Sequence, residues 1–296
     1  MAADLDSEYA YRHSIVLELF IKTADDNYVT ARWSYANGFD VDFAWNAVHC
    51  FEKYLKATLL LNGRSGKANL VGGKKLNYGH DIERLYDEAK QLAPELLPQK
   101  LTCPAEIDDP RWRDETPEQF ITRLYNMGNA DNRYQLNGYI LRDGDLFKLD
   151  QMVFSVRRLC QPLESHFLGK QRPGVPDESR RQRILKDNPH WSNLGAHLEL
   201  TVAGKRGEEA RHAALNLNFP IAPTNYKHTE MRGPLYTFTN PVLVRRILDP
   251  LDAGKPAQDK HADDLWKWVR EYIHLPPGFI EAYEHERAKR KAAAKP

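Results

Sequence analysis

The 296-residue sequence has few cysteines, no long apolar run and almost no net charge. Its three cysteines, Cys50, Cys103 and Cys160, are odd in number and widely spaced, which is typical of reduced thiols and not of a disulfide framework or a metal site. No apolar stretch approaches the roughly 18–20 residues that a membrane-spanning helix needs. The net charge of +1 provides no general attraction to nucleic acid, so any such binding must come from a local patch.

The composition is that of a folded globular protein. Hydrophobic residues make up 42% of the chain and charged residues 28%, a balance that excludes general disorder. The first six residues, Met1 to Asp6, are acidic and contain no apolar signal core, which predicts a cytoplasmic protein without membrane association. No cofactor motif and no metal-ligand spacing is present, so we expect neither group.

Apolar periodicity predicts a mainly helical chain. We expect helices over residues 8–22, 24–36, 41–62, 81–93, 116–128 and 144–168, followed by 179–186, 206–218, 259–274 and 277–293. The first two are also compatible with one continuous helix, and Pro162 is expected to kink or end the helix over 144–168. Short connections favour antiparallel neighbours. The predicted fold is therefore all-α, with an up-down antiparallel bundle over 1–168 and an irregular, mostly helical extension over 169–296 that packs on or beside it.

Several segments lack helical periodicity. The Gly- and Lys-rich stretch 63–75 is not a phosphate-binding loop, because Gly66-Lys67 is not followed by the Ser or Thr that binds magnesium. We expect a flexible surface loop there. Residues 198–202 alternate in a way that is also compatible with a strand. The proline-rich stretch 219–241 is predicted to lie extended over the helices.

The predicted helix over 41–62 is the most informative segment. Glu52 precedes Lys56 by four residues, the favourable order for an ion pair, and Gly63 follows where a helix-terminating glycine is expected. The apolar positions that define its buried face are Val48, Phe51, Leu55, Leu59 and Leu60.

Four short motifs, taken in order, resemble the HEPN family (higher eukaryotes and prokaryotes nucleotide-binding domain) over roughly residues 8–168. They are the Thr23–Arg32 helix, the string Glu52-Lys-Tyr-Leu-Lys-Ala57, the His80-Asp81-Ile82 helix start, and Asn132-Arg133-Tyr134 before a late helix. The resemblance implies that the 41–62 helix packs beside 24–36 and 144–168. It also implies a homodimer, and many members associate with a nucleotidyltransferase.

The function that this resemblance implies is binding of nucleotide or RNA, or scaffolding of a partner. Lys53, Lys56, His80 and Arg133 would then line a groove for a nucleotide or an RNA backbone. Three of the four have a specific structural alternative: Lys56 pairs with Glu52, His80 caps the helix that Asp81 begins, and Arg133 binds helix carbonyls. A purely structural module without a ligand is a further alternative.

Some HEPN proteins are metal-independent ribonucleases of toxin or anti-phage type, which gives an alternative function. These use an Arg and a His separated by four to six residues, brought together across a dimer. The chain offers two such spacings, Arg183 with His190 and Arg206 with His212. Neither lies in the segment that resembles the bundle, and with eleven histidines such spacings also arise by chance.

A basic cluster beside an aromatic residue is a separate candidate for nucleic-acid contact. Arg180, Arg181 and Arg183 precede Trp191, and such a combination suits single-stranded nucleic acid, since the ring stacks on a base while the charges hold phosphate. The alternative is an ordinary solvated helix face.

Overall fold

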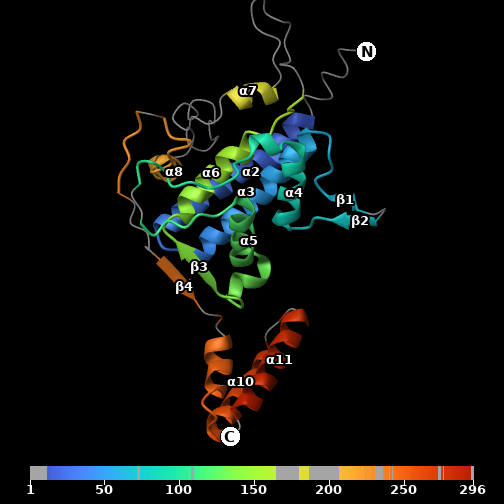
Figure 1. Ribbon diagram of the computed structural model, residues 1–296, viewed down its shortest axis with the longest axis vertical. Helices are drawn as coiled ribbons and strands as arrows, with labels where there is room; N and C mark the ends of the chain where they lie inside the picture. The colour runs from blue at the N-terminus through green and yellow to red at the C-terminus, as the bar shows by residue number, and fades with distance from the viewer. Residues whose placement is uncertain are drawn as a thin grey trace, which may run out of the picture. The chain divides into compact units, whose positions relative to one another are not determined.

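The computed structural model describes residues 12–71, 74–107, 110–164, 180–186, 207–223, 225–230, 236–239, 241, 243–272, 275 and 277–294. Within these ranges the chain is predominantly helical, and the strands form two short two-stranded sheets (Figure 1). The predicted all-α class is confirmed. No helix in these ranges is both long and apolar enough to cross a bilayer.

The chain divides into two compact units, Met1–Asn129 with Leu141–Tyr236, and Ala130–Ile140 with Thr237–Pro296. The predicted division after residue 168 falls in the 165–179 stretch, which lies outside the described residues. The strand alternative at 198–202 also lies outside them.

The first unit is built around a helical hairpin. The chain is helical from its first described residue, 12, through the π-helical turn η1 (Leu17–Ile21) into α2 (Lys22–Ala36), so the first two predicted helices are continuous. After a short turn, α3 (Asp40–Leu61) follows, close to the predicted 41–62. After one cap residue, each helix is followed by a glycine with a φ of +74° (Gly38 and Gly63), a conformation that glycine adopts without steric cost.

Ring contacts and hydrogen bonds show that α2 and α3 run antiparallel. The rings of Tyr35 and Phe43 meet edge-on near the turn, with centroids 5.2 Å apart. At the other end, the hydroxyl of Tyr54 donates to the carboxylate of Asp25. The predicted apolar face of α3 is buried except at Leu60, which is 38% exposed because it lies one residue beyond the stripe that ends at Leu59.

Helix α6 (Asp145–Arg157) packs against both α2 and α3, as expected for the segment after residue 144 (Figure 1). Two buried ion pairs join α6 to α2. In one of them the carboxylate is on α2, and in the other it is on α6. Arg157 donates to Asp25 at 2.7 and 2.9 Å, and Arg32 donates to Asp150 at 2.8 and 2.9 Å. The two pairs are seven residues apart on each helix, so a parallel alignment would place like charges together.

The predicted continuation of this last helix to residue 168 is wrong, because α6 ends at Arg157. Pro162 has no N–H to extend the helical ladder. The side chain of Asn62 binds the chain that follows, donating to the carbonyl of Gln161 at 3.0 Å and accepting from the N–H of Leu163 at 2.9 Å.

Two further helices, α4 (Ile82–Leu92) and α5 (Pro117–Gly128), also pack against α3. Helix α4 is capped at its N-terminus by Asp81, whose side chain accepts from the Arg84 N–H. A short 3₁₀ turn, η2 (Pro94–Leu96), follows it. Helix α5 starts with a capping box between Thr116 and Gln119. Its last residue, Gly128, lies so close to α3 that a Cβ would come within 2.2 Å of the Ala44 carbonyl oxygen.

A network of charges joins α5 to α6. Glu115 accepts from Arg123 at 2.8 Å, from Arg142 at 3.2 Å and from the buried Lys148 at 2.5 Å. Arg123 also binds Asp145 at 2.6 Å. Burial acts to raise the pKa of Glu115, but the hydrogen bonds and charges of Arg123 and Lys148 outweigh it and hold that pKa at about 2.

The flexible loop predicted over 63–75 is in part a β-hairpin, so that prediction is wrong. Strands β1 (Ala68–Val71) and β2 (Lys74–Asn77) pair antiparallel, with Ala68 opposite Asn77 and Val71 opposite Lys74. The hydroxyl of Ser65 accepts from the backbone N–H groups of residues 67 and 68, which organises the entry. The glycines and lysines around these strands are typical of a loop, so the sequence did not indicate that the two strands pair.

Two short helices and an irregular segment cover the first unit. Helix α7 (Arg180–Lys186) packs against η2. Helix α8 (Glu208–Leu215) packs against α2, where Arg32 donates to the carbonyls of Ala213 at 2.5 Å and Asn216 at 2.8 Å. The residues that follow, 216–223 and 225–230, lie against α2 and α6, so the predicted covering of the helices is present in this part. They form turns around 216–222 and not the extended chain predicted over 219–241, and residues 236–239 of that stretch form a strand.

The second unit has a core of its own. Its elements are η3 (Ala130–Tyr134), η5 (Val244–Leu248), α9 (Asp249–Leu251), α10 (Pro256–Tyr272) and α11 (Pro277–Ala293). Strand β3 (Tyr139–Arg142) pairs with β4 (Tyr236–Thr239). Trp266 of α10 stacks on Tyr283 of α11 with ring centroids 4.3 Å apart, over a buried cluster that includes Ile247 and Leu251. The two predicted C-terminal helices are therefore present.

Candidate nucleic-acid interface

A band of polar and aromatic side chains runs along α3 beside its apolar stripe. It consists of Trp45, His49, Glu52, Lys53 and Lys56, at successive spacings of four, three, one and three residues. Because such spacings keep side chains on neighbouring turns of one helical face, these residues form a continuous surface, which we call the α3 polar face.

Glu52 lies at the centre of this face, with its side chain only 9% exposed. It accepts from the Lys56 ammonium at 2.6 Å, and its other oxygen lies 3.0 Å from Nδ1 of His80 and 3.5 Å from Nδ1 of His49. Burial acts to raise the pKa of Glu52, but the hydrogen bonds from His49, Lys56 and His80 are stronger and hold the pKa at about 2. Glu52 therefore stays ionised and orients three nitrogen-bearing side chains.

His80 reaches this face from a turn that precedes α4. Gly79 takes a positive φ of 55°, and its carbonyl accepts from Lys56 at 2.8 Å. The His80 side chain is 75% exposed, so it meets solvent while Nδ1 contacts Glu52. The helix cap is Asp81 and not His80, whereas the predicted ion pair between Lys56 and Glu52 is confirmed.

Lys53 is positioned by neutral groups. Its ammonium donates to Oδ1 of Asn27 at 2.6 Å and lies 3.5 Å from the carbonyl of Thr23, and Asn27 in turn donates to Asn46 at 2.9 Å. Among the contacts within the described ranges, no carboxylate balances this charge. Lys53 is thus the group on the α3 polar face best able to attract an anion.

Aromatic rings extend the face. The indole of Trp45 meets the His49 ring edge-on at 4.4 Å, and the His49 and His80 rings are 6.3 Å apart. Trp45 and His49 were missed as site residues by sequence reasoning. The signal that was available is their spacing, since both lie on the turns that carry Glu52 and Lys53.

The other predicted site residues lie elsewhere. Arg181 on α7 binds the Leu92 carbonyl at 3.0 Å, Glu164 at 2.7 Å and also Glu95, which is a structural role at the end of α4. Arg180 and Arg183 share that helix, and Arg133 lies in η3 of the second unit.

The two predicted Arg–His pairs are only partly described. His190 and Arg206 lie outside the described residues, so neither pair can be placed. His212 lies on α8, where its ring nitrogens are 3.4 Å from the Tyr226 hydroxyl and 3.3 Å from the Thr229 hydroxyl. Within the part of the chain that the structure describes, no group of three or more His, Cys, Asp or Glu residues is placed to hold a metal ion.

Comparisons of this chain with models of protein families, with curated proteins and with solved structures give no match. The function must therefore be argued from the geometry of the site itself.

Proposed function

We propose that this protein binds single-stranded RNA, or the phosphates of a nucleotide, on the α3 polar face. The observation that carries the proposal is that Lys56 and His80, two residues singled out by the HEPN resemblance, meet at Glu52 although His80 is 28 positions from Glu52 in sequence. Lys53, a third such residue, follows Glu52 directly on α3 and is held by Asn27. The resemblance to that family remains part of the proposal, together with the homodimer, the nucleotidyltransferase partner and the cytoplasmic location that accompany it.

The chemistry of the face suits a nucleic-acid backbone. Lys53 supplies a positive charge that neutral oxygens hold in place, and the exposed imidazole of His80 offers a further hydrogen-bonding group. Trp45 offers a ring on which a base can stack, worth about 1–3 kcal/mol per base. Because Glu52 neutralises Lys56, we expect modest affinity and little sequence preference.

Fluorescence anisotropy with a fluorescein-labelled 20-nucleotide single-stranded RNA tests the proposal. Lys53→Ala should weaken binding and reduce the slope of log Kd against log salt concentration by about 0.7, the value for one lost phosphate contact on a single strand. Trp45→Leu should weaken binding with little change in that slope, because stacking involves no counterion release.

The matched control is Lys90→Ala, which removes an exposed lysine that pairs with Glu118 on α5. It changes the net charge by the same amount and should leave the affinity unaltered. Equal affinities and slopes for Lys53→Ala and Lys90→Ala, or no binding by the unmodified protein, would contradict the proposal.

A second candidate function, metal-independent RNA cleavage, is favoured by the arrangement of His49 and His80 on one carboxylate. In such a reaction one imidazole removes the proton of a ribose 2′-hydroxyl, whose oxygen attacks phosphorus. The other imidazole gives a proton to the departing 5′-oxygen, leaving a 2′,3′-cyclic phosphate and a 5′-hydroxyl. These residues would take the place of the Arg–His pairs expected from sequence.

Incubation of the protein with the same RNA in excess chelator tests this candidate. Cleavage that yields cyclic phosphate ends and is lost in both His49→Ala and His80→Ala would support it. RNA left intact by the unmodified protein would remove it and leave the binding proposal standing.

A further inference from the structure

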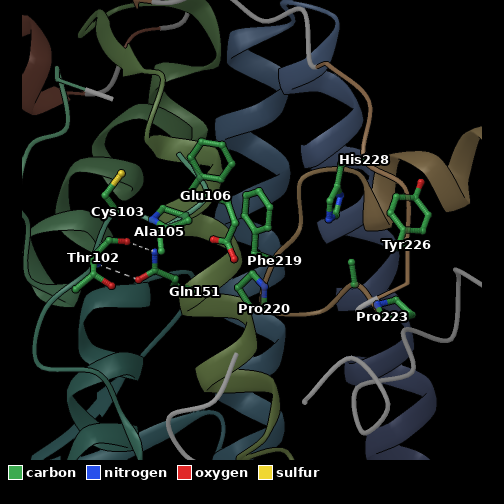
Figure 2. Close-up of a pocket in the computed structure, with 13 residues that line it drawn as sticks. Thr102, Cys103, Ala105, Glu106, Gln151, Phe219, Pro220, Pro223, Tyr226 and His228 are labelled. Carbon is green, nitrogen blue, oxygen red and sulfur yellow. Dashed lines mark hydrogen bonds between the residues drawn. The ribbon is translucent and has the colours of Figure 1, made fainter. Parts of the chain in front are cut away.

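A pocket of about 490 Å³ lies on the first unit, and its lining includes none of the residues of the α3 polar face. Figure 2 shows the residues that line this pocket. One wall is the irregular segment from Thr102 to Glu106, and the floor is formed by Phe147 and Gln151 of α6. The opposite wall is formed by residues within 219–223 and 226–228. Its volume falls within the range of about 300–1,000 Å³ that is usual for small-molecule sites.

Hydrogen bonds hold both walls in place. On one side, the Gln151 amide donates to the Thr102 carbonyl at 2.5 Å and accepts from the Thr102 N–H at 3.0 Å. On the other side, the buried Asn216 accepts from the Thr229 N–H at 2.7 Å and donates to the Thr229 carbonyl at 3.1 Å. The pocket is therefore preformed, which lowers the entropic cost of filling it.

Aromatic rings line the pocket in series. The rings of Phe147 and Phe219 are 6.1 Å apart, those of Phe219 and His228 are 5.1 Å apart, and those of Tyr226 and His228 are 5.3 Å apart. Such rings contact a planar molecule through their faces and edges and attract a cation through their electron-rich faces.

The charged and neutral side chains that line the pocket determine whether it favours a cationic or an anionic ligand. The Glu106 carboxylate is exposed and, within the described residues, accepts no hydrogen bond from the protein. His228 is kept neutral, because the backbone N–H of Leu217 donates to its Nδ1 at 2.9 Å. Burial and the charge of Arg32 further lower the pKa of His228. Leu217 has a φ of +52°, a rarely adopted conformation that aims its N–H at the ring.

We infer that this pocket binds a small planar aromatic molecule with a single positive charge, such as an aromatic amine, with the ring among Phe147, Phe219 and His228 and the cation beside Glu106. Among the described lining residues Glu106 carries the one formal charge, so an anion of the same shape is repelled. The pocket is proposed to bind a cation, whereas the α3 polar face is proposed to bind an anion, so the two proposals are independent.

Isothermal titration calorimetry of the full chain with tryptamine tests the inference, with indole-3-propionate as an anion of similar shape. Tryptamine should bind at least about tenfold more tightly than indole-3-propionate, and Glu106→Gln should remove about tenfold of that affinity, as expected for a lost charge-assisted contact. Phe219→Leu, which keeps an apolar side chain but removes a ring, should weaken both ligands.

The control is Glu209→Gln, which removes the charge of an exposed carboxylate on α8 outside the lining and should leave tryptamine affinity unchanged. Cys103 supplies a second measurement, because this half-buried cysteine is one of the residues that line the pocket. Tryptamine should slow alkylation of Cys103 by iodoacetamide several-fold, in the unmodified protein and equally in Lys53→Ala. No heat of binding up to millimolar tryptamine, equal affinity for the two ligands, or binding without protection of Cys103 would overturn the inference.

Discussion

Replacing Asp150 by Asn should strongly destabilise the first unit. In the native protein the side chains of Asp150 and Arg32 have no solvent exposure. Asp150 accepts two hydrogen bonds from Arg32, at 2.8 and 2.9 Å, and one from the hydroxyl of Tyr28 at 2.5 Å. The substitution preserves volume, so it creates no cavity and isolates the effect of the charge.

The expected magnitude follows from what remains around Arg32. The guanidinium keeps its contacts with the carbonyls of Ala213 and Asn216, but no anion is left to balance its charge. Removing one partner of a buried ion pair typically costs about 3–5 kcal/mol. Since whole domains have unfolding free energies of about 5–15 kcal/mol, the variant should lose a large share of its stability.

Urea unfolding followed by circular dichroism measures the difference. Hydrogen exchange of peptides from α2 and α6 assigns the transition to the first unit, which matters because two units need not unfold together. The control is Glu118→Gln, which removes the same charge from the exposed pair with Lys90 and should cost at most about 1 kcal/mol. If Asp150→Asn cost no more than this control, the stabilising role assigned to the buried pair would be refuted.

Three other substitutions or reactions test separate parts of the first unit. Gly128→Ala forces a methyl group against the backbone of α3 and should cost about 1–3 kcal/mol in thermal or urea unfolding, whereas Gly207→Ala, where nothing lies within 4 Å, should be nearly neutral. The pKa of Glu115 is depressed to about 2, so its contribution to stability is present above the unfolded pKa of about 4.3 and disappears as the pH falls toward 2. Glu115→Gln should therefore show a shallower loss of stability between these pH values in acid titration. Mass spectrometry after brief iodoacetamide treatment of the native protein should find Cys103 labelled first, since the other two cysteines are buried and burial raises their pKa.

Local signals were sufficient to predict most helices. The spacing of Phe51, Leu55 and Leu59 indicated the buried face of α3, and Gly63 indicated its end. The hairpin at 68–77 was missed because glycine and lysine around short strands resemble a loop. The end of α6 at Arg157 was missed because it depends partly on Asn62, which lies far away in sequence.

The candidate site was predictable only where its contacts are local. The pairing of Glu52 with Lys56 follows from their spacing on one helix, and it is confirmed. The approach of His80 depends on how the β1–β2 hairpin returns the chain to α3, which no local pattern encodes. The aromatic pocket depends on Phe219 meeting Phe147 across 72 positions of sequence, which no periodicity in either segment indicates.

The opposed charges on α2 and α6 have a consequence for synthesis on the ribosome. Asp25 and Arg32 are translated before their partners, which lie 132 and 118 positions later in the sequence. Until α6 leaves the exit tunnel, burying α2 would place both charges in an apolar interior without compensation. The nascent hairpin of α2 and α3 should therefore stay open and accessible to chaperones until most of the first unit has been translated.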